Sequence, residues 1–267
     1  MTTQTGGETE FGGSMLTGVT NFRDFGGYPT GDGRSVRTGV LFRCGHLAGA
    51  TQADIEKLTA LGLSVIVDLR REPERERQPT GGWADRCRTI RSDLLGGDDP
   101  WWTFLRVSDL SVGSIRRHLL DFYRGLPFDP SYVDLFSRFF EALATTTGPL
   151  LVHCTGGKDR TGVVVALTHR LLGVHPDDTL ADYLLTNRVW QFDHHGAAVA
   201  SGIAAVIGRT PVKAAVRAVM EVEAGYLAAG FDAIEAQCGS LDAYFEDTLS
   251  VTRAAREAIA LRLIGHP

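Results

Sequence analysis

The pattern of apolar and polar residues along the chain predicts short strands mixed with longer helices. Several short runs of apolar residues are bounded by glycine, proline or charged residues, as strands commonly are. The run at 149–153 is almost wholly apolar, which is typical of a strand buried at the centre of a sheet. The predicted strands cover residues 39–43, 64–69, 88–92 and 149–153.

Helical periodicity fills much of the chain between and after these strands. Thr51 and Ser131 stand at N-cap positions of two expected helices, and Pro127 follows the end of another. Strands that alternate with helices indicate the α/β class, with a central sheet flanked by helices. The predicted helices cover residues 52–61, 112–126, 131–145, 160–172, 179–190 and 252–264.

The length and composition are those of a globular protein. The chain has 267 residues, of which 43% are hydrophobic, so it can bury a large core. This length is common for one α/β domain. Residues 1–14 are polar and rich in glycine and threonine, so we expect a disordered tail there and a single domain over residues 15–267. The sequence leaves the oligomeric state open.

The charge, hydropathy and cysteine content of the sequence argue against several kinds of protein. The formal net charge of −5 argues against general nucleic-acid binding. The chain contains no apolar run of about 18 residues, so no transmembrane helix is expected. The N-terminus lacks the apolar region of a secretory signal. The cysteines at 44, 87, 154 and 238 show neither metal-ligand spacing nor a dense disulfide framework, so we expect no metal or cofactor and favour the reducing cytoplasm.

The most informative stretch follows the apolar run at 149–153 and precedes the expected helix at 160–172. A loop that leads into a helix N-terminus points several backbone N–H groups at one spot, where the helix dipole adds positive potential. Such a cradle suits a tetrahedral anion such as phosphate. The stretch reads His153-Cys154-Thr155-Gly156-Gly157-Lys158-Asp159-Arg160-Thr161-Gly162.

Each residue type in this loop suits phosphate chemistry. Gly156 and Gly157 let the backbone curl and approach a ligand closely. The positive field that holds an anion also favours the thiolate of Cys154, a strong nucleophile. Arg160 offers a planar fork of donors that fits two phosphate oxygens, and Thr161 can hydrogen-bond the thiolate.

One nucleotide-binding interpretation is excluded by the same residues. The phosphate-binding motif of nucleotide hydrolases requires Gly-x-x-x-x-Gly-Lys followed by Ser or Thr. In this chain Asp159 follows Lys158, and Val152 stands where the first glycine is needed.

The loop resembles the signature of cysteine-dependent tyrosine and dual-specificity phosphatases. The fuller pattern Cys-x-x-Gly-Lys-Asp-Arg-Thr-Gly is similar to that of an atypical bacterial family of tyrosine phosphatases, and the similarity extends over roughly residues 19–264. Further matching segments are Asn21-Phe22-Arg23-Asp24-Phe25-Gly26-Gly27, Gly39-Val40-Leu41-Phe42-Arg43, Val65-Ile66-Val67-Asp68-Leu69-Arg70 with Glu74, and Tyr183-Leu184-Leu185-Thr186-Asn187.

The resemblance implies a phosphatase with Cys154 as nucleophile and Arg160 as phosphate ligand. Its expected substrate is phosphotyrosine, with phosphoserine or phosphothreonine and phosphoinositides as further candidates. A phosphatase directed mainly at phosphoinositides, a catalytically silent phospho-ligand binder and a sulfur-transfer enzyme are the alternatives. A member of the family is exported without a signal peptide, so export remains open beside the cytoplasm. The loop residues His153, Thr155, Gly156, Gly157, Lys158, Thr161 and Gly162 are expected to shape the substrate site.

The proton donor for the leaving group is less well determined. Asp159 lies beside Arg160 and is the first choice, as in similar loops of the atypical family. Asp68 follows, because it stands at the carboxyl end of a predicted strand, where α/β active sites open. Asp121 has the offset seen in the larger relatives, but lies in a predicted helix. The remaining candidates are Asp98 and Asp99.

Three features bear on substrate access. Lys158 is either a residue that holds the loop by an ion pair or a ligand for a second anionic group of the substrate. Residues 70–91 contain seven arginines and four acidic residues, which indicates either a solvated loop or a basic rim. Residues 191–230 carry Val212, Val216 and Val219 at helical spacing and form either a core helix or, as the resemblance suggests, a helical lid.

Overall fold

The computed structural model describes residues 16–94, 100–190 and 192–265. The predicted tail at 1–14 and the acid candidates Asp98 and Asp99 lie outside these residues. None of the helices in the described part is long and apolar enough to cross a membrane.

A five-stranded sheet in the order β1-β2-β5-β3-β4 forms the centre of the protein. Strand β5 lies in the middle and pairs in parallel with β2 and β3, while β1 runs antiparallel to β2 at one edge. Every residue of β5 is buried, as its apolar sequence predicted. The strands are β1 (Arg23–Asp24), β2 (Leu41–Cys44), β3 (Val65–Asp68), β4 (Arg88–Arg91) and β5 (Leu150–His153).

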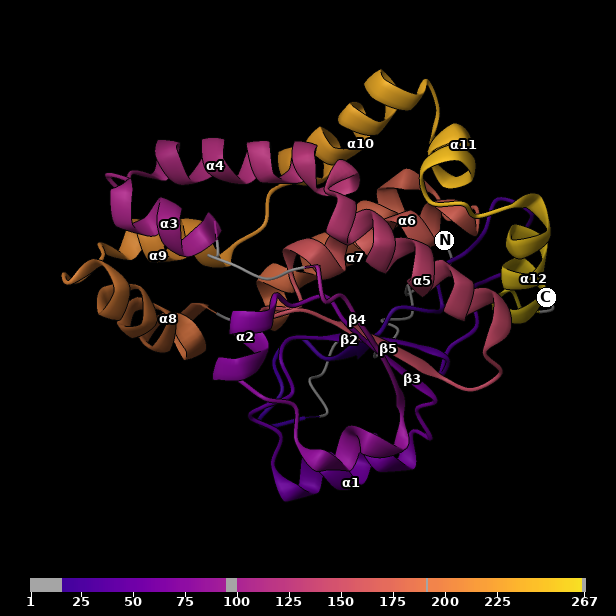
Figure 1. Ribbon diagram of the computed structural model, residues 1–267, viewed down its shortest axis with the longest axis horizontal. Helices are drawn as coiled ribbons and strands as arrows, with labels where there is room; N and C mark the ends of the chain where they lie inside the picture. The colour runs from indigo at the N-terminus through magenta and orange to yellow at the C-terminus, as the bar shows by residue number, and fades with distance from the viewer. Residues whose placement is uncertain (1–15, 95–99, 191, 266–267) are drawn as a thin grey trace, which may run out of the picture.

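Helices cover both faces of the sheet (Figure 1). Successive side chains of β5 alternate between two apolar clusters, with Leu151 in one and Leu150 and Val152 in the other. The first cluster includes Leu58 of helix α1 (Gln52–Ala60). The second is larger and includes residues of α5 (Pro130–Thr145), α6 (Asp159–Leu171) and α12 (Arg253–Leu263). The predicted α/β class, with a central sheet flanked by helices, is therefore confirmed.

The helices expected from the sequence are present, with ends shifted by a few residues. Asp129, rather than Ser131, caps α5, and its side chain accepts a hydrogen bond from the Ser131 amide. The sequence pattern predicted β4 but did not reveal β1 or the short helices between β3 and α4. The remaining helices are α2 (Glu72–Arg77), α3 (Pro100–Val107), α4 (Val112–Gly125), α7 (Pro176–Val189), α8 (Phe192–Ile207), α9 (Lys213–Met220), α10 (Ala224–Cys238) and α11 (Leu241–Ala243), with short turns of helix at Gly82–Arg86, Leu126–Phe128 and Tyr244–Thr248.

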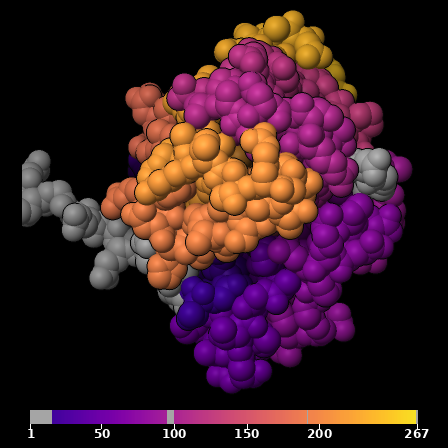
Figure 2. All heavy atoms as spheres, turned by 90° about the vertical axis from the view of Figure 1, so that its left-hand side faces the viewer, coloured from indigo at the N-terminus to yellow at the C-terminus, as the bar shows by residue number. Residues whose placement is uncertain are grey.

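The helices α3, α4, α8 and α9 gather beyond one end of the sheet (Figure 1). Helix α8 packs against α9 and α3, and α4 packs against α9 and α10. Figure 2 shows α8 and α9, in orange, in the middle of this face of the protein, below the magenta α4. The segment predicted as either a core helix or a lid thus contains α8, α9 and the start of α10.

Candidate active site

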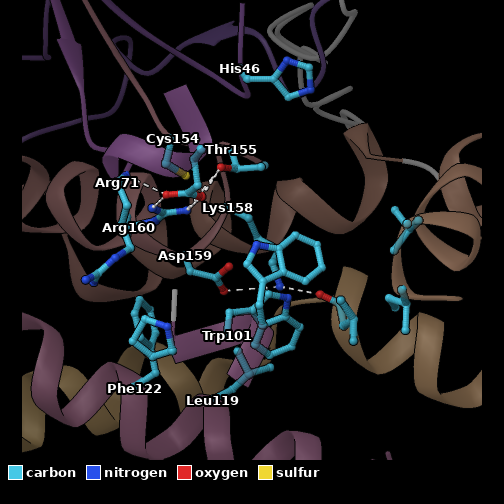
Figure 3. A pocket seen from close by; sticks show the side chains of 18 of the residues that line it. His46, Arg71, Trp101, Leu119, Phe122, Cys154, Thr155, Lys158, Asp159 and Arg160 are labelled. Carbon is cyan, nitrogen blue, oxygen red and sulfur yellow. Dashed lines mark hydrogen bonds and ion pairs between the residues drawn. The ribbon is translucent and has the colours of Figure 1, made fainter. Parts of the chain in front are cut away.

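The loop between β5 and α6 lies at the carboxyl end of the central strand. Strand β5 ends at His153, and α6 begins at Asp159. Open sites of α/β proteins form at this end of a parallel sheet. Cys154, Thr155, Lys158, Asp159 and Arg160 point toward the same cavity (Figure 3), so the structure brings together the side chains that the sequence singled out. The Cys154 side chain is buried at its base.

The side chains of Asn21 and Arg43 support the turn that the loop makes at Gly157. Gly157 has a positive φ of 62°, and a Cβ atom there would lie 2.2 Å from the carbonyl oxygen of Cys44. The Gly157 carbonyl accepts hydrogen bonds from Asn21 Nδ2 at 2.7 Å and Arg43 Nη2 at 2.8 Å. Only glycine meets both the backbone angle and the close approach.

A buried ionic cluster fixes those supporting residues. Asp182 of α7 pairs with Arg23 at 3.0 Å and with Arg43 at 2.7 Å. Arg23 in turn donates to the side-chain oxygen of Asn21. Burial by itself would raise the pKa of Asp182, but the two guanidinium groups hold it well below its usual range. The cluster therefore connects β1, β2 and α7 to the back of the loop.

Glu74 of α2 orients the arginine of the loop. Its carboxylate accepts from Arg160 Nη1 at 2.6 Å and from Nη2 at 2.7 Å, a bidentate pair. Glu74 also accepts a hydrogen bond from the Thr155 hydroxyl. Burial opposes the charged form of Glu74, yet the neighbouring Arg160 lowers the pKa of this carboxyl to about 2. The guanidinium of Arg160 thus has a fixed orientation beside Cys154.

The residues near Cys154 in the sequence have different surroundings. His153 is fully buried, and its Nδ1 lies 3.3 Å from the Cys154 carbonyl oxygen. Burial lowers the pKa of His153, which favours the neutral ring and a role in holding the backbone. The Thr161 hydroxyl is buried without a hydrogen-bond partner among the described residues. Its bond to the Cys154 thiolate stays a prediction.

Asp159, the first residue of α6, lines the cavity beside Arg160. Its Oδ1 atom accepts a hydrogen bond of 2.8 Å from the Tyr123 hydroxyl of α4. The same oxygen lies 3.3 Å from Lys158 Nζ. The aspartate therefore lines the same cavity as Cys154 and is open to it.

Lys158 is almost entirely buried and contacts the helices that cover the cavity. Its Nζ donates to the carbonyl oxygens of Val219 at 2.7 Å and Glu221 at 3.5 Å, at the C-terminal end of α9. Together with the contact to Asp159, these bonds favour the interpretation in which Lys158 holds the loop in place. They also connect the loop to α9.

The other described acid candidates are less suitable. Asp68 is buried and pairs with Arg70 at 2.7 Å. Although burial opposes it, the neighbouring His153 and Arg70 hold the pKa of Asp68 below its ordinary value. Asp121 borders the cavity, but its side chain is 76% exposed and pairs with Arg124. Among the described candidates, Asp159 is the carboxyl that both lies beside the Cys154 loop and is open to the cavity.

The cavity measures about 980 Å³, and most of its wall is apolar. Aromatic side chains of α3 and α4 form one side, and small or aliphatic residues of α8 form another. Among its lining residues are Trp101, Trp102, Leu119, Phe122, Trp190, Val199, Gly202 and Ile203. Of the arginines in the region 70–91, Arg71 and Arg77 also border the cavity, whereas Arg70 is buried beside Asp68. The idea of a basic rim therefore applies to two arginines rather than to the whole region.

Several residues that build the site were not recognised as functional from the sequence. Asn21, Arg23, Arg43 and Glu74 lie in the segments that carry the family resemblance, but the pattern did not show what they contact. Asp182 and Tyr123 carried no signal of their own. A pairing of buried opposite charges becomes visible only once α7 is packed against the sheet.

A buried cysteine, an oriented arginine and an adjacent aspartate around an anion-binding loop define a phosphatase site of the cysteine-dependent class. Comparison with known sequences agrees with the geometry. The model of the tyrosine phosphatase family matches residues 14–265, and the chain belongs to this family. It is a protein-tyrosine phosphatase by family.

Three relatives illustrate the similarity. A protein of Cupriavidus necator named "Putative tyrosine-protein phosphatase" is 36% identical over 237 residues, which cover 87% of this chain and 82% of the relative. The triple specificity protein phosphatase PtpB of Mycobacterium tuberculosis is 32% identical over 193 residues, 64% of this chain and 68% of that protein. A tyrosine-protein phosphatase of Nostoc commune is 29% identical over 157 residues, 55% of this chain and 48% of that protein.

Proposed function

We propose that this phosphatase hydrolyses phosphotyrosine with Cys154 as nucleophile, Arg160 as phosphate ligand and Asp159 as proton donor and acceptor. The observation that supports this assignment best is the arrangement of these three side chains at one cavity, with Arg160 already oriented by Glu74. No other described carboxyl combines this position with this access.

The reaction follows in two steps. The Cys154 thiolate attacks phosphorus in line, the bond to the leaving oxygen breaks, and that oxygen takes a proton from Asp159. Water then attacks the thiophosphoryl-cysteine, gives its proton to Asp159 and releases phosphate and the thiolate. Arg160 and the amides of the loop stabilise the charge on the equatorial oxygens in both steps.

The cavity also bears on the range of substrates. Its volume and apolar wall exceed what one phosphotyrosine ring needs, so it offers space for residues flanking the phosphorylated side chain or for the glycerol and acyl portion of a phosphoinositide. We propose phosphotyrosine as the main substrate, with phosphoserine, phosphothreonine and phosphoinositides as secondary ones. The relative from Mycobacterium tuberculosis, named a triple specificity phosphatase, agrees with a broad range.

We propose that helices α8 and α9 form a lid over this cavity. Val199 and Ile203 of α8 and Val219 of α9 line the cavity, so these helices separate Cys154 from bulk water. Exclusion of water would strengthen the electrostatic stabilisation of the reacting groups and protect the thiol from oxidation. A reducing compartment such as the cytoplasm would suit the free thiol, although export is compatible with the proposal.

Phosphate release tests the function directly. The purified, reduced protein is assayed without added metal on a phosphotyrosine peptide, a phosphoserine peptide and a short-chain phosphoinositide, with Cys154→Ser and Asp159→Asn as variants. We expect turnover that is lost in Cys154→Ser and strongly reduced in Asp159→Asn, with phosphotyrosine as the best substrate. Tight binding of phosphopeptide without turnover would leave a binding module, and faster lipid turnover would make phosphoinositides the main substrate.

A further inference from the structure

Two tyrosines from different helices form a hydrogen-bonded chain that ends on Asp159. The Tyr123 hydroxyl of α4 donates to Asp159 Oδ1 at 2.8 Å. The hydroxyls of Tyr123 and Tyr183 of α7 lie 2.7 Å apart. Both tyrosine side chains are fully buried, so water does not compete for these bonds.

Which hydroxyl donates in each of these two hydrogen bonds follows from counting the available hydrogens. A tyrosine hydroxyl has one hydrogen to donate and lone pairs to accept. Because Tyr123 gives its hydrogen to Asp159, the bond between the tyrosines must be donated by Tyr183. Both hydroxyl dipoles therefore point toward the carboxylate, and bonds of this kind favour the ionised form of an acid.

We infer that Tyr123 is a positioning residue that sets the protonation of Asp159 during catalysis, with Tyr183 supporting it. This inference rests on the proposed role of Asp159 as acid and base. Tyr123 and Lys158 both engage Oδ1, which leaves Oδ2 to carry the proton that is transferred. The hydroxyl bond also fixes the rotation of the carboxyl group toward the cavity.

The tyrosines stay neutral donors across the working range of the enzyme. Burial, and after it the nearby Asp159, raise the pKa of Tyr123 well above its usual value. Burial also raises the pKa of Tyr183. A change in activity near neutral pH therefore does not reflect ionisation of either tyrosine.

Other charged or titratable groups surround Asp159 and must be considered in any pH profile. They come from the loop, from the segment after β2, from the start and body of α2, and from the helices α4, α7, α8 and α10. These groups are Cys154, Lys158, Arg160, His46, Arg71, Glu74, Arg77, His118, Asp121, Tyr123, Tyr183, His195 and Tyr226.

The test is the pH dependence of kcat for Tyr123→Phe on a phosphotyrosine peptide, whose leaving group needs a proton. Loss of the hydroxyl makes the ionised form of Asp159 less stable, so the acid form persists to higher pH. We expect the basic limb of the profile to move up by about one pH unit, the size associated with losing one hydrogen bond to a charged group. With 4-nitrophenyl phosphate, a better leaving group, the limb should move less.

Tyr226→Phe is the matched control, because it removes a hydroxyl from the same aromatic cluster. The Tyr226 ring stacks on Tyr123 with centroids 5.6 Å apart, but its hydroxyl is not bonded to Asp159. This variant should keep the wild-type profile. If Tyr123→Phe does not fold, Tyr183→Phe replaces it, and it should move the limb in the same direction by a smaller amount.

The outcomes separate this inference from the function on which it rests. A basic limb that moves in Tyr123→Phe and is absent in Asp159→Asn supports both. A limb that is absent in Asp159→Asn but unmoved in Tyr123→Phe overturns the tyrosine inference and leaves Asp159 as the acid. A limb that persists in Asp159→Asn overturns the assignment of Asp159 and the tyrosine inference with it, while the nucleophile is still tested by Cys154→Ser.

Discussion

The two Nη atoms of Arg160 face the two carboxylate oxygens of Glu74 at 2.6 and 2.7 Å. One partner comes from the start of α6 and the other from the short helix α2, which the sequence pattern did not predict. The arginine that is proposed to bind phosphate is therefore oriented by a residue that lies 86 positions earlier in the chain.

Glu74→Gln should reduce catalysis more than it reduces folding. The amide cannot accept two charge-assisted bonds from Arg160, so the guanidinium loses its fixed orientation. We expect kcat/KM for a phosphotyrosine peptide to fall by about 10- to 100-fold, as when a reacting or binding group is misplaced by a small distance. Glu76→Gln on the exposed side of the same helix is the control and should leave kcat/KM unchanged. Equal kinetics for the two variants would contradict the role of Glu74.

The lowered pKa of the Glu74 carboxyl also predicts how the free energy of unfolding depends on pH. The pKa of Glu74 falls from 4.5 to about 2 in the folded protein, so its ionised form stabilises the fold at any pH above 4.5. This contribution, about 3 kcal/mol at neutral pH, is lost as the pH falls from about 4.5 to about 2. Urea unfolding of wild type and Glu74→Gln should show a difference at pH 7 that narrows steadily below pH 4.5. A difference that stays constant between pH 7 and pH 3 would argue against the ion pair.

Gly157→Ala should damage both the fold of the loop and its chemistry. The new Cβ would lie 2.2 Å from the Cys44 carbonyl oxygen, and the positive φ of 62° would be strained. We expect a loss of about 1–3 kcal/mol in the free energy of unfolding, with phosphatase activity near background. Gly239→Ala is the comparison, since φ there is 76° but the space is open. That variant should lose about 1 kcal/mol and keep its activity, and full activity in Gly157→Ala would rule out the close approach.

Lys158→Met tests whether this lysine connects the loop to the lid or binds a second anionic group. If it connects them through Val219, hydrogen exchange over residues 213–222 should accelerate and Cys154 should react faster with hydrogen peroxide. Activity should then fall alike for a phosphotyrosine peptide and a phosphoinositide bisphosphate. A loss confined to the bisphosphate, with exchange unchanged, would instead show contact with a second phosphate. Lys213→Met, which removes a lysine of α9 located over Phe192, controls for the loss of charge.

The local pattern of the chain predicted four of the five described strands, the helices α1, α4, α5, α6, α7 and α12, and the loop that carries the candidate site. The apolar run at 149–153 predicted a buried strand, which β5 confirms, and the spacing of Cys154 and Arg160 in one loop predicted an anion cradle. These features were readable because hydrophobic periodicity and loop geometry depend on neighbours within about one turn or one strand.

Contacts between distant segments were decided by the tertiary structure alone. Tyr123 meets Asp159 because the fold brings the end of α4 to the start of α6, and Asp182 meets Arg23 because the fold brings α7 to β1. Leaving a buried charge or hydroxyl without a partner costs free energy once water is excluded, and packing decides which partners are within reach. The sequence by itself thus predicted the nucleophile and its cradle, whereas the tertiary structure decided which distant side chains contact them.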